Sequence, residues 1–210
     1  MLFAIGLILL AYLLGSVPTA VWVGKSFYGI DVREFGSGNA GATNTFRVLG
    51  KKAGIPVLIF DIVKGSLAVA LAYFSNFEPD GNEFINFQLG LGVAVLIGHI
   101  FPVFAGFRGG KGVATLLGIV VCILPVACSI SLLVFLFVLF ATRYVSLSSM
   151  SAGLVFPFVL HFILHNTNEV LTIFSVTVAV LLIITHRKNI KRLLKNQESK
   201  VNLFQIQNKS

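Results

Sequence analysis

The chain has 210 residues, of which 56% are hydrophobic and 11% are charged, and its mean hydropathy is +0.92. A soluble domain carries roughly 25% charged residues, so this composition excludes one and predicts a chain that lies in a lipid bilayer. The net charge of +8 does not indicate nucleic acid as a partner. Basic residues gather in the tail from Arg187 onward, and such a segment suits the anionic headgroups of membrane lipids.

Seven apolar stretches follow one another, and most approach the roughly 20 residues that a membrane-spanning helix needs. We therefore expect an all-α, polytopic integral membrane protein with seven transmembrane helices, built as one membrane domain over 1–210 with a basic cytoplasmic tail at 187–210. The short fourth stretch is separated from the fifth by Pro125, and the two could instead form one kinked or re-entrant element. The stretches lie near 1–24, 54–74, 87–105, 112–124, 125–141, 145–165 and 169–186.

The distribution of charge favours seven spans with the N-terminus outside. In that topology fifteen of the sixteen Lys and Arg residues fall in cytoplasmic segments, and the sixteenth, Lys64, lies within a helix. The outer loops carry acidic residues and no Lys or Arg, which is the positive-inside pattern and places the C-terminus in the cytoplasm. A count of six spans breaks this pattern. The acidic residues of the outer loops are Glu78, Asp80, Glu83 and Glu169.

The sequence GSGNAGATNTFR at 36–47 interleaves glycine with small polar residues and ends on Arg47. Glycine allows the backbone to turn several N–H groups toward one anion, so this motif predicts a phosphate site. It is not a nucleotide P-loop, because Ala42 precedes Thr43 where that motif requires Lys before Ser or Thr. A flexible interfacial loop is the plainer alternative.

A second glycine-rich motif, GHIFPVFAGFRGGKGVAT at 98–115, places four glycines around Arg108 and Lys111. It also lacks the residues of a nucleotide P-loop. A second cationic turn that binds an anion is one interpretation, and a basic hairpin turn that only sets the membrane topology is the other.

Two shorter motifs add polar residues near the expected cytoplasmic surface. RYVSLSS at 143–149 contains Ser146, which helix N-capping explains equally well, and THRKNIKR at 185–192 places His186 and Asn189 on one helical face. Membrane anchoring explains the cations of the second motif but not its His and Asn. All four motifs reach the same side in the predicted topology, and together they suit a ligand with more than one phosphate charge.

Several ionisable residues lie within or at the ends of the apolar stretches. Asp61 and Lys64 are one helical turn apart, and they could be functional or could form an ion pair that braces the helices. His99 could have a structural or a chemical role. His161 and His165 have the spacing of metal ligands, but they lie far from the glycine-rich motifs, so we expect no metal site there.

The sequence lacks the motifs of conventional hydrolases: no GxSxG, HExxH or Hx4D motif is present. Serine-dependent or zinc-dependent hydrolysis is therefore not expected. We expect Cys122 and Cys128 to be free thiols packed among apolar side chains, although a disulfide is conceivable.

The four motifs, together with DIVKG at 61–65, resemble the bacterial acyl-phosphate:glycerol-3-phosphate acyltransferase family (PlsY) along nearly the whole chain. The resemblance implies a seven-helix enzyme of the bacterial inner membrane with its active site on the cytoplasmic side. It implies transfer of a fatty acyl group from acyl-phosphate to the sn-1 hydroxyl of glycerol 3-phosphate, without cofactor or metal, as the first step of phospholipid synthesis. One departure is Asn196, which stands where the family often has Gly.

The resemblance also implies the roles of individual residues. The first motif holds the phosphate of acyl-phosphate, with the side chains of Ser37, Thr43 and Asn44 as donors. The attacking hydroxyl loses its proton to a phosphate oxygen of the substrate, with His99 as the rival base. The implied catalytic residues are Ser37, Arg47, Lys111, His186 and Asn189, and the implied substrate-binding residues are Gly36, Gly38, Asn39, Gly41, Thr43, Asn44, His99, Arg108 and Ser146.

Two other classes of protein share some of these features. A transporter of organic phosphates also needs apolar helices, glycine breaks and cations, but it places its site near the midplane and usually between repeats, and no repeat is evident here. A lipid-binding scaffold that acts through the basic tail leaves the motif at 36–47 unexplained.

Overall fold

The computed structural model describes residues 1–79 and 81–201, and every regular element in these two ranges is helical. The chain divides into two compact units, which are described separately. The first unit comprises residues 1–126, and the second begins at Ala127. The all-α expectation is therefore confirmed for the described residues.

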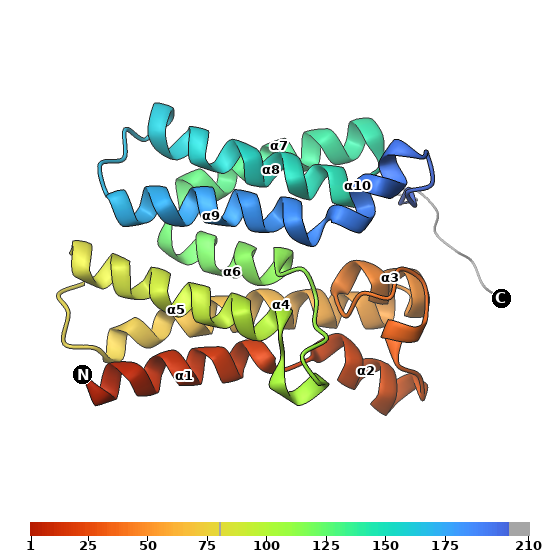
Figure 1. Cartoon of the computed structure of the whole chain (residues 1–210), viewed down its shortest axis with the longest axis horizontal. Helices are drawn as coiled ribbons and strands as arrows, with labels where there is room; N and C mark the ends of the chain where they lie inside the picture. The colour runs from red at the N-terminus through yellow and green to blue at the C-terminus, as the bar shows by residue number, and fades with distance from the viewer. Residues whose placement is uncertain (80, 202–210) are drawn as a thin grey trace. The chain divides into compact units, whose positions relative to one another are not determined.

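The first unit is built on two helix pairs in which glycines let the backbones approach closely. α1 (Leu2–Ser16) packs along α5 (Asn82–Ile100), and α4 (Lys51–Ala70) packs along α6 (Val113–Ile123), as Figure 1 shows. A Cβ at Gly15 would collide with the backbone of Val95. A Cβ at Gly118 would collide in the same way with the carbonyl oxygen of Ile62. Small residues at such crossings are typical of helices packed within membranes.

The first apolar stretch is not one helix over 1–24. α1 ends at Ser16, and α2 (Thr19–Tyr28) leaves it at an angle of 40°. Val17 precedes Pro18 and has an extended conformation with ψ 108°, as the residue before a proline favours. Hydropathy alone gives no sign of this break, because the residues on both sides of it are apolar.

Two connections of the first unit carry the glycine-rich motifs. A short 3₁₀ turn (Val32–Glu34) leads into the first glycine loop, residues 36–41, and that loop leads into α3 (Ala42–Leu49). A second 3₁₀ turn (Val103–Ala105) leads from α5 into the second glycine loop, residues 106–112, which ends at α6. A further 3₁₀ turn (Leu71–Phe74) extends the C-terminal end of α4.

The second unit contains α7 (Pro125–Thr142) from Ala127 onward, α8 (Val145–Phe158), α9 (Glu169–Thr185) and α10 (Arg187–Leu194). α8 and α9 lie side by side (Figure 1), and the position of Gly153 is filled by the side chain of Leu182. A π-helical turn (Val159–Ile163) extends α8 just after Pro157. α10 turns away from α9 by 57° at His186.

Four of the described helical segments are long and apolar enough to cross a membrane, and the count rises to six when each bent pair is one span. α6 has 11 residues and is shorter than a full span. It ends before Leu124, so 112–141 contains two helices and not one continuous element. The count of seven spans and the orientation of the termini stay predictions.

Candidate functional site

The first glycine loop is ordered by the side chain of Asn44, in the first turn of α3. The amide nitrogen of Asn44 donates to the carbonyl oxygens of Val32 at 2.8 Å and Phe35 at 3.1 Å. Its amide oxygen accepts from the backbone N–H of Ser37 at 2.8 Å and from the Ser37 hydroxyl at 3.1 Å. Asn44 is buried, and Gly36 turns beside it at φ 62°. Asn44 therefore holds the loop from the inside.

The backbone that follows this turn offers a row of donors. Within residues 1–79 and 81–201, the five consecutive N–H groups from Asn39 to Thr43 have no acceptor from the protein, and no side chain caps α3. Ala40, Gly41 and Ala42 are buried, and a buried N–H group needs an acceptor. The N-terminus of a helix also favours negative charge. This row of N–H groups is therefore suited to bind an anion such as phosphate.

Arg47 lies one turn further along α3 and is exposed. Its Nη1 donates to the amide oxygen of Asn44 at 3.4 Å. The guanidinium thus lies beside the first glycine loop, where it can add a positive charge to the N–H groups of the backbone.

The second glycine loop folds back onto the end of α5. The N–H of Gly109 donates to the carbonyl oxygen of Ile100, and the N–H of Gly110 donates to that of His99, both at 3.1 Å. A Cβ at Gly109 would lie on the carbonyl oxygen of His99, so this approach requires glycine. Gly112 leads into α6 at φ 81°.

A clamp that the sequence did not reveal lies just before the first glycine loop. Arg33 forms a two-pronged ion pair with Asp31, with Nε to Oδ1 at 2.9 Å and Nη2 to Oδ2 at 2.7 Å. The hydrogen bonds from Arg33 hold the pKa of Asp31 well below its usual range, and Asp31 in turn raises the pKa of Arg33. Both groups are therefore charged at neutral pH.

The same arginine connects the two glycine loops. Its Nη1 donates to the carbonyl oxygen of Ala105 at 2.8 Å and to that of Arg108 at 3.3 Å. These carbonyls lie on either side of Gly106, at the start of the second loop. The structure therefore ties together the two motifs that the sequence suggested as anion sites, in the part of the chain that also carries Lys111.

His99 lies inside the first unit and is 6% exposed. Its Nδ1 shares a hydrogen bond of 3.1 Å with the hydroxyl of Thr115 and lies 3.7 Å from Oδ1 of Asp61. Asp61 pairs with Lys64 at 2.8 Å. Of the two roles suggested for Asp61 and Lys64, the structure thus contains the ion pair.

In the second unit, three donors converge on the carboxylate of Glu198. The hydroxyl of Ser146 donates to Oε1 at 2.8 Å, Asn189 donates to the same oxygen at 2.6 Å, and Arg192 donates to Oε2 at 2.6 Å. Burial raises the pKa of Glu198, but the hydrogen bonds from Arg192, Asn189 and Ser146 outweigh it and lower that pKa overall. We refer to Ser146, Asn189, Arg192 and Glu198 as the Glu198 cluster.

The turn that brings Glu198 back to α10 begins at Asn196. The N–H of Gln197 donates to the carbonyl oxygen of Arg192 and that of Asn196 donates to Leu193, which is the Schellman arrangement at a helix C-terminus. Asn196 has φ 54°, a conformation that glycine adopts freely and that asparagine tolerates best among the other residues. A glycine at this position would suit the same turn.

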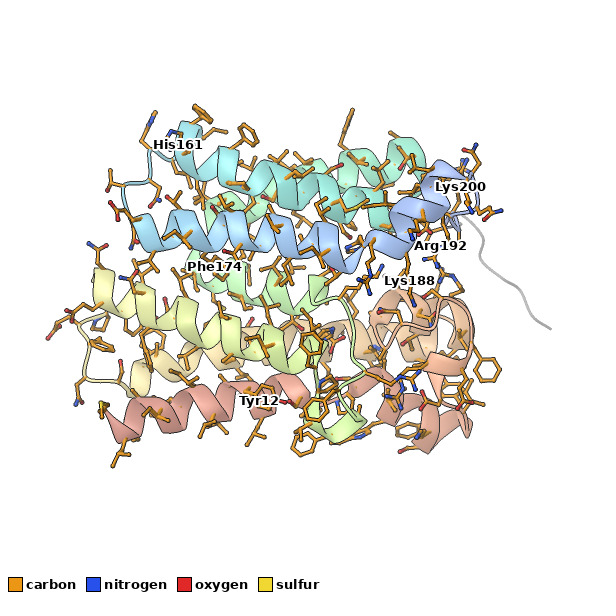
Figure 2. All side chains as sticks on the ribbon, viewed as in Figure 1. Tyr12, His161, Phe174, Lys188, Arg192 and Lys200 are labelled. Atoms are coloured by element: carbon orange, nitrogen blue, oxygen red, sulfur yellow. The ribbon has the colours of Figure 1, made fainter. Side chains whose placement is uncertain are left out.

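The remaining predicted residue of the second unit, His186, lies at the bend between α9 and α10. Its Nδ1 is 2.8 Å from the carbonyl oxygen of Leu182, so Nδ1 carries the proton in that hydrogen bond. Figure 2 shows Arg192 and Lys200 at one end of the second unit and His161 at the opposite end. No group of three metal-ligating side chains occurs among the described residues. Cys122 and Cys128 are free thiols, as expected; Cys128 is buried, whereas Cys122 is exposed.

The structure assembles the predicted residues, apart from His186, into three local groups. The first glycine loop contains or adjoins Gly36, Ser37, Gly38, Asn39, Gly41, Thr43, Asn44 and Arg47; the second joins His99, Arg108 and Lys111; and the Glu198 cluster joins Ser146 and Asn189. Sequence reasoning missed Asp31, Arg33, Arg192 and Glu198. It counted the two arginines only as signals of topology, and only the i, i+2 spacing of Asp31 and Arg33 hinted at an ion pair.

The sequence profile of the glycerol-3-phosphate acyltransferase family matches residues 5–196. Similar curated proteins, each named glycerol-3-phosphate acyltransferase, occur in several bacteria. The protein of Enterococcus faecalis is 44% identical over 93% of this chain and 90% of its own. That of Bacillus cereus is 46% identical over 96% of both chains, and that of Listeria welshimeri is 45% identical over 92% of this chain and 94% of its own.

Two crystal structures of PlsY, an integral membrane glycerol 3-phosphate acyltransferase, share this architecture. Both are 38% identical to the chain and cover 96% of it and 99% of their own length. The glycerol 3-phosphate form has a TM-score of 0.85, and the lysophosphatidic acid form has a TM-score of 0.82.

Proposed function

Because the chain belongs to the glycerol-3-phosphate acyltransferase family, we propose that it transfers a fatty acyl group from acyl-phosphate to the sn-1 hydroxyl of glycerol 3-phosphate. The products are lysophosphatidic acid and inorganic phosphate. The protein is a multi-pass membrane acyltransferase, and this reaction is a step of phospholipid synthesis. The proposal extends the family assignment to the acyl donor and to the hydroxyl that accepts the acyl group.

The row of N–H groups from Asn39 to Thr43 is the observation that supports an acyl-phosphate donor most strongly. Five backbone donors at the start of a helix fit a compact phosphate. Asn44 has both of its amide hydrogens engaged by Val32 and Phe35, so we assign it the task of ordering the loop and not of binding the phosphate itself. The hydroxyls of Ser37 and Thr43 remain proposed donors to the ligand, and that of Ser37 would exchange its bond to Asn44 for one to the phosphate.

The proposed reaction needs no covalent nucleophile from the protein. Acyl-phosphate is a mixed anhydride: the hydroxyl oxygen of glycerol 3-phosphate attacks its carbonyl carbon, and the bond from that carbon to the phosphate oxygen breaks. The proton of the attacking hydroxyl passes to an oxygen of the departing phosphate. Positioning and neutralisation of negative charge then supply most of the rate.

Glycerol 3-phosphate brings a second phosphate group, for which we propose Arg47 and Lys111 as the principal cations. The resemblance to the family adds His186 and Asn189, with Ser146 as a neighbouring donor. Asn189 and Ser146 both donate to the carboxylate of Glu198, so in this role they would exchange that carboxylate for an oxygen of the phosphate.

The donor is tested with purified protein given glycerol 3-phosphate and one of three palmitoyl donors: acyl-phosphate, acyl-CoA or acyl-carrier protein. We expect lysophosphatidic acid from acyl-phosphate alone, with one phosphate released for each acyl group transferred. Phosphate release should be far slower when glycerol 3-phosphate is omitted. Comparable turnover with palmitoyl-CoA would contradict the proposal.

We further propose that the enzyme lies in the bacterial inner membrane with both glycine loops in the cytoplasm, because of the distribution of Lys and Arg. In a variant without Cys122 and Cys128, Glu78→Cys should react with an impermeant maleimide in intact cells, and Lys52→Cys should not. The opposite labelling would invert the topology and move the proposed site outside.

A further inference from the structure

A buried group of polar side chains lies beneath the second glycine loop. We infer that this group positions the loop, and with it Lys111, and that His99 acts on catalysis only through that support. We define the buried polar cluster as Thr19, Asp61, Lys64, His99 and Thr115. The kinetic part of this inference rests on the proposed function, whereas its structural part does not.

The cluster joins α2, α4, α5 and α6, and it also contacts the break between α1 and α2. Asp61 of α4 contacts Lys64 at 2.8 Å and accepts from the hydroxyl of Thr19 in α2 at 3.3 Å. Lys64 donates to the carbonyl oxygen of Val17 at 3.1 Å, between α1 and α2. In the bilayer such a carbonyl has no water to bind, so the lysine satisfies a backbone group that the broken helix frees. The charge of Lys64 is balanced by Asp61, which is 2% exposed.

His99 links this ion pair to the second glycine loop. One side of its ring faces Thr115 and Asp61 through Nδ1, and the other side lies against Gly110, where a Cβ would fall on Nε2. The backbone of His99 also accepts the N–H of Gly110 at 3.1 Å. Both the ring and the main chain of His99 therefore fix the same residue of the loop, one position before Lys111.

A small cavity shows that the cluster also reaches the first glycine loop. It has a volume of about 10 Å³, enough for one water molecule, and its lining includes Ala40 of the first loop and Gly109 and Gly110 of the second. Asp61, Lys64 and His99 supply the ionisable part of the lining. A ring packed between buried charges and the backbone has little room to reach a substrate hydroxyl, which argues against His99 as the base that receives its proton.

The inference is tested first by hydrogen exchange of the purified full-length protein without substrate. His99→Leu removes the ring nitrogens, His99→Asn keeps a polar group near the place of Nδ1, and Thr115→Val removes the hydroxyl. We expect amide exchange over residues 106–112 to rise about 10-fold in His99→Leu, and less in His99→Asn. Ser66→Ala is the matched control, because it removes the bond from α4 to the carbonyl oxygen of Gly118 without touching either loop. Unchanged exchange of the loop in His99→Leu would overturn the inference.

Kinetics then separate a positioning residue from a base. With acyl-phosphate as donor, we expect Thr115→Val and His99→Asn to raise the KM for glycerol 3-phosphate about 10-fold, with kcat within about 3-fold of wild type and an unchanged pH profile. A loss of kcat of about 100-fold together with loss of the acidic limb of the profile would make His99 the base and overturn the inference. If no variant or wild-type protein uses acyl-phosphate, the proposed function fails while the exchange result still decides the role of the cluster.

The ion pair offers an independent test. Asp61→Asn and Lys64→Met each leave one buried charge without its partner, whereas the double variant leaves none. We expect amide exchange over residues 106–112 to rise in each single variant. In the double variant it should return most of the way to the wild-type rate. An equal rise in amide exchange in all three variants would contradict the idea that the paired charges, acting through His99, support the loop.

Discussion

The first glycine loop and the Glu198 cluster both gather hydrogen-bond donors, and they differ in what accepts from those donors. In the loop, Asn44 arranges the chain from below and leaves the N–H groups of Asn39 to Thr43 without a protein acceptor. In the cluster, the carboxylate of Glu198 accepts from Ser146, Asn189 and Arg192. The loop is thus prepared for an external anion, and the cluster already contains one from its own chain.

This difference has an energetic basis. A backbone N–H group carries only a partial charge, so leaving it without a protein acceptor costs less than leaving a full charge unpaired. The carboxylate of Glu198 carries a full charge and is only 5% exposed, so it needs Arg192 as its partner at all times. We therefore expect changes near the loops to affect mainly catalysis and changes to Glu198 or Arg192 to affect mainly stability.

The largest effect should follow loss of a cation beside the glycine loops. A cation that binds phosphate in a partly dry site contributes about 2–4 kcal/mol to the transition state, so Arg47→Ala or Lys111→Ala should lower kcat/KM about 30- to 1000-fold. Lys51→Ala, an exposed cation at the start of α4, is the control and should change little. If a folded Arg47→Ala or Lys111→Ala protein had the kinetics of wild type, that residue would serve only to set the membrane topology.

A somewhat smaller loss should follow a change to the residue that orders the first loop. Asn44→Asp keeps the shape of the side chain but replaces two donated hydrogen bonds, to Val32 and Phe35, with contacts between oxygen atoms. We expect kcat/KM to fall about 10- to 100-fold. Hydrogen exchange over residues 36–41 should rise in the same variant. A rigid loop with full activity would show that Asn44 does not order the phosphate site.

The glycine loops could be predicted from sequence because their signal is local. Gly36 and Gly112 adopt positive φ, and glycine is the residue that does so at no steric cost. The helical stretches were also predictable, since a membrane span is a long apolar run. The break at Pro18 was missed because hydropathy averaged over 1–24 does not respond to one missing N–H group.

The contacts that complete the candidate site could not be predicted, because they join distant parts of the chain. Arg33 reaches carbonyls more than 70 residues away, and Glu198 reaches Ser146 from the far end of the sequence. Glu198 arrives there only because Asn196 adopts a left-handed turn after α10. The distribution of charged residues predicted on which side of the membrane these residues lie, but it carried no information on which atoms they contact.

The clamp between the loops should have a moderate effect. Arg33→Lys keeps the charge but cannot hold Asp31 with two nitrogens and also donate to Ala105 and Arg108, so the two loops should lose their fixed spacing. We expect kcat/KM to fall about 5- to 20-fold. Lys25→Ala is a close control, because Lys25 contacts the same Asp31 at 3.4 Å but is itself exposed and leaves the clamp intact. Equal losses in both variants would mean that the charge around Asp31 matters and the connection between the loops does not.

The smallest effect on turnover, and a clear effect on stability, should come from Glu198→Gln. The amide can still accept hydrogen bonds, but it removes the anion beside Arg192, at a cost of about 1 kcal/mol or a few degrees in the apparent midpoint of thermal unfolding. Because the fold lowers the pKa of Glu198 below the ordinary 4.5, its contribution is complete above that pH and is lost as the pH falls through the lowered value. Wild type and Glu198→Gln should therefore differ at pH 7 and converge in acid when unfolding is followed by circular dichroism. Glu34→Gln changes an exposed carboxylate and should show no such convergence. A difference between wild type and Glu198→Gln that stays constant with pH would mean that the shape of the side chain, and not its charge, holds the cluster together.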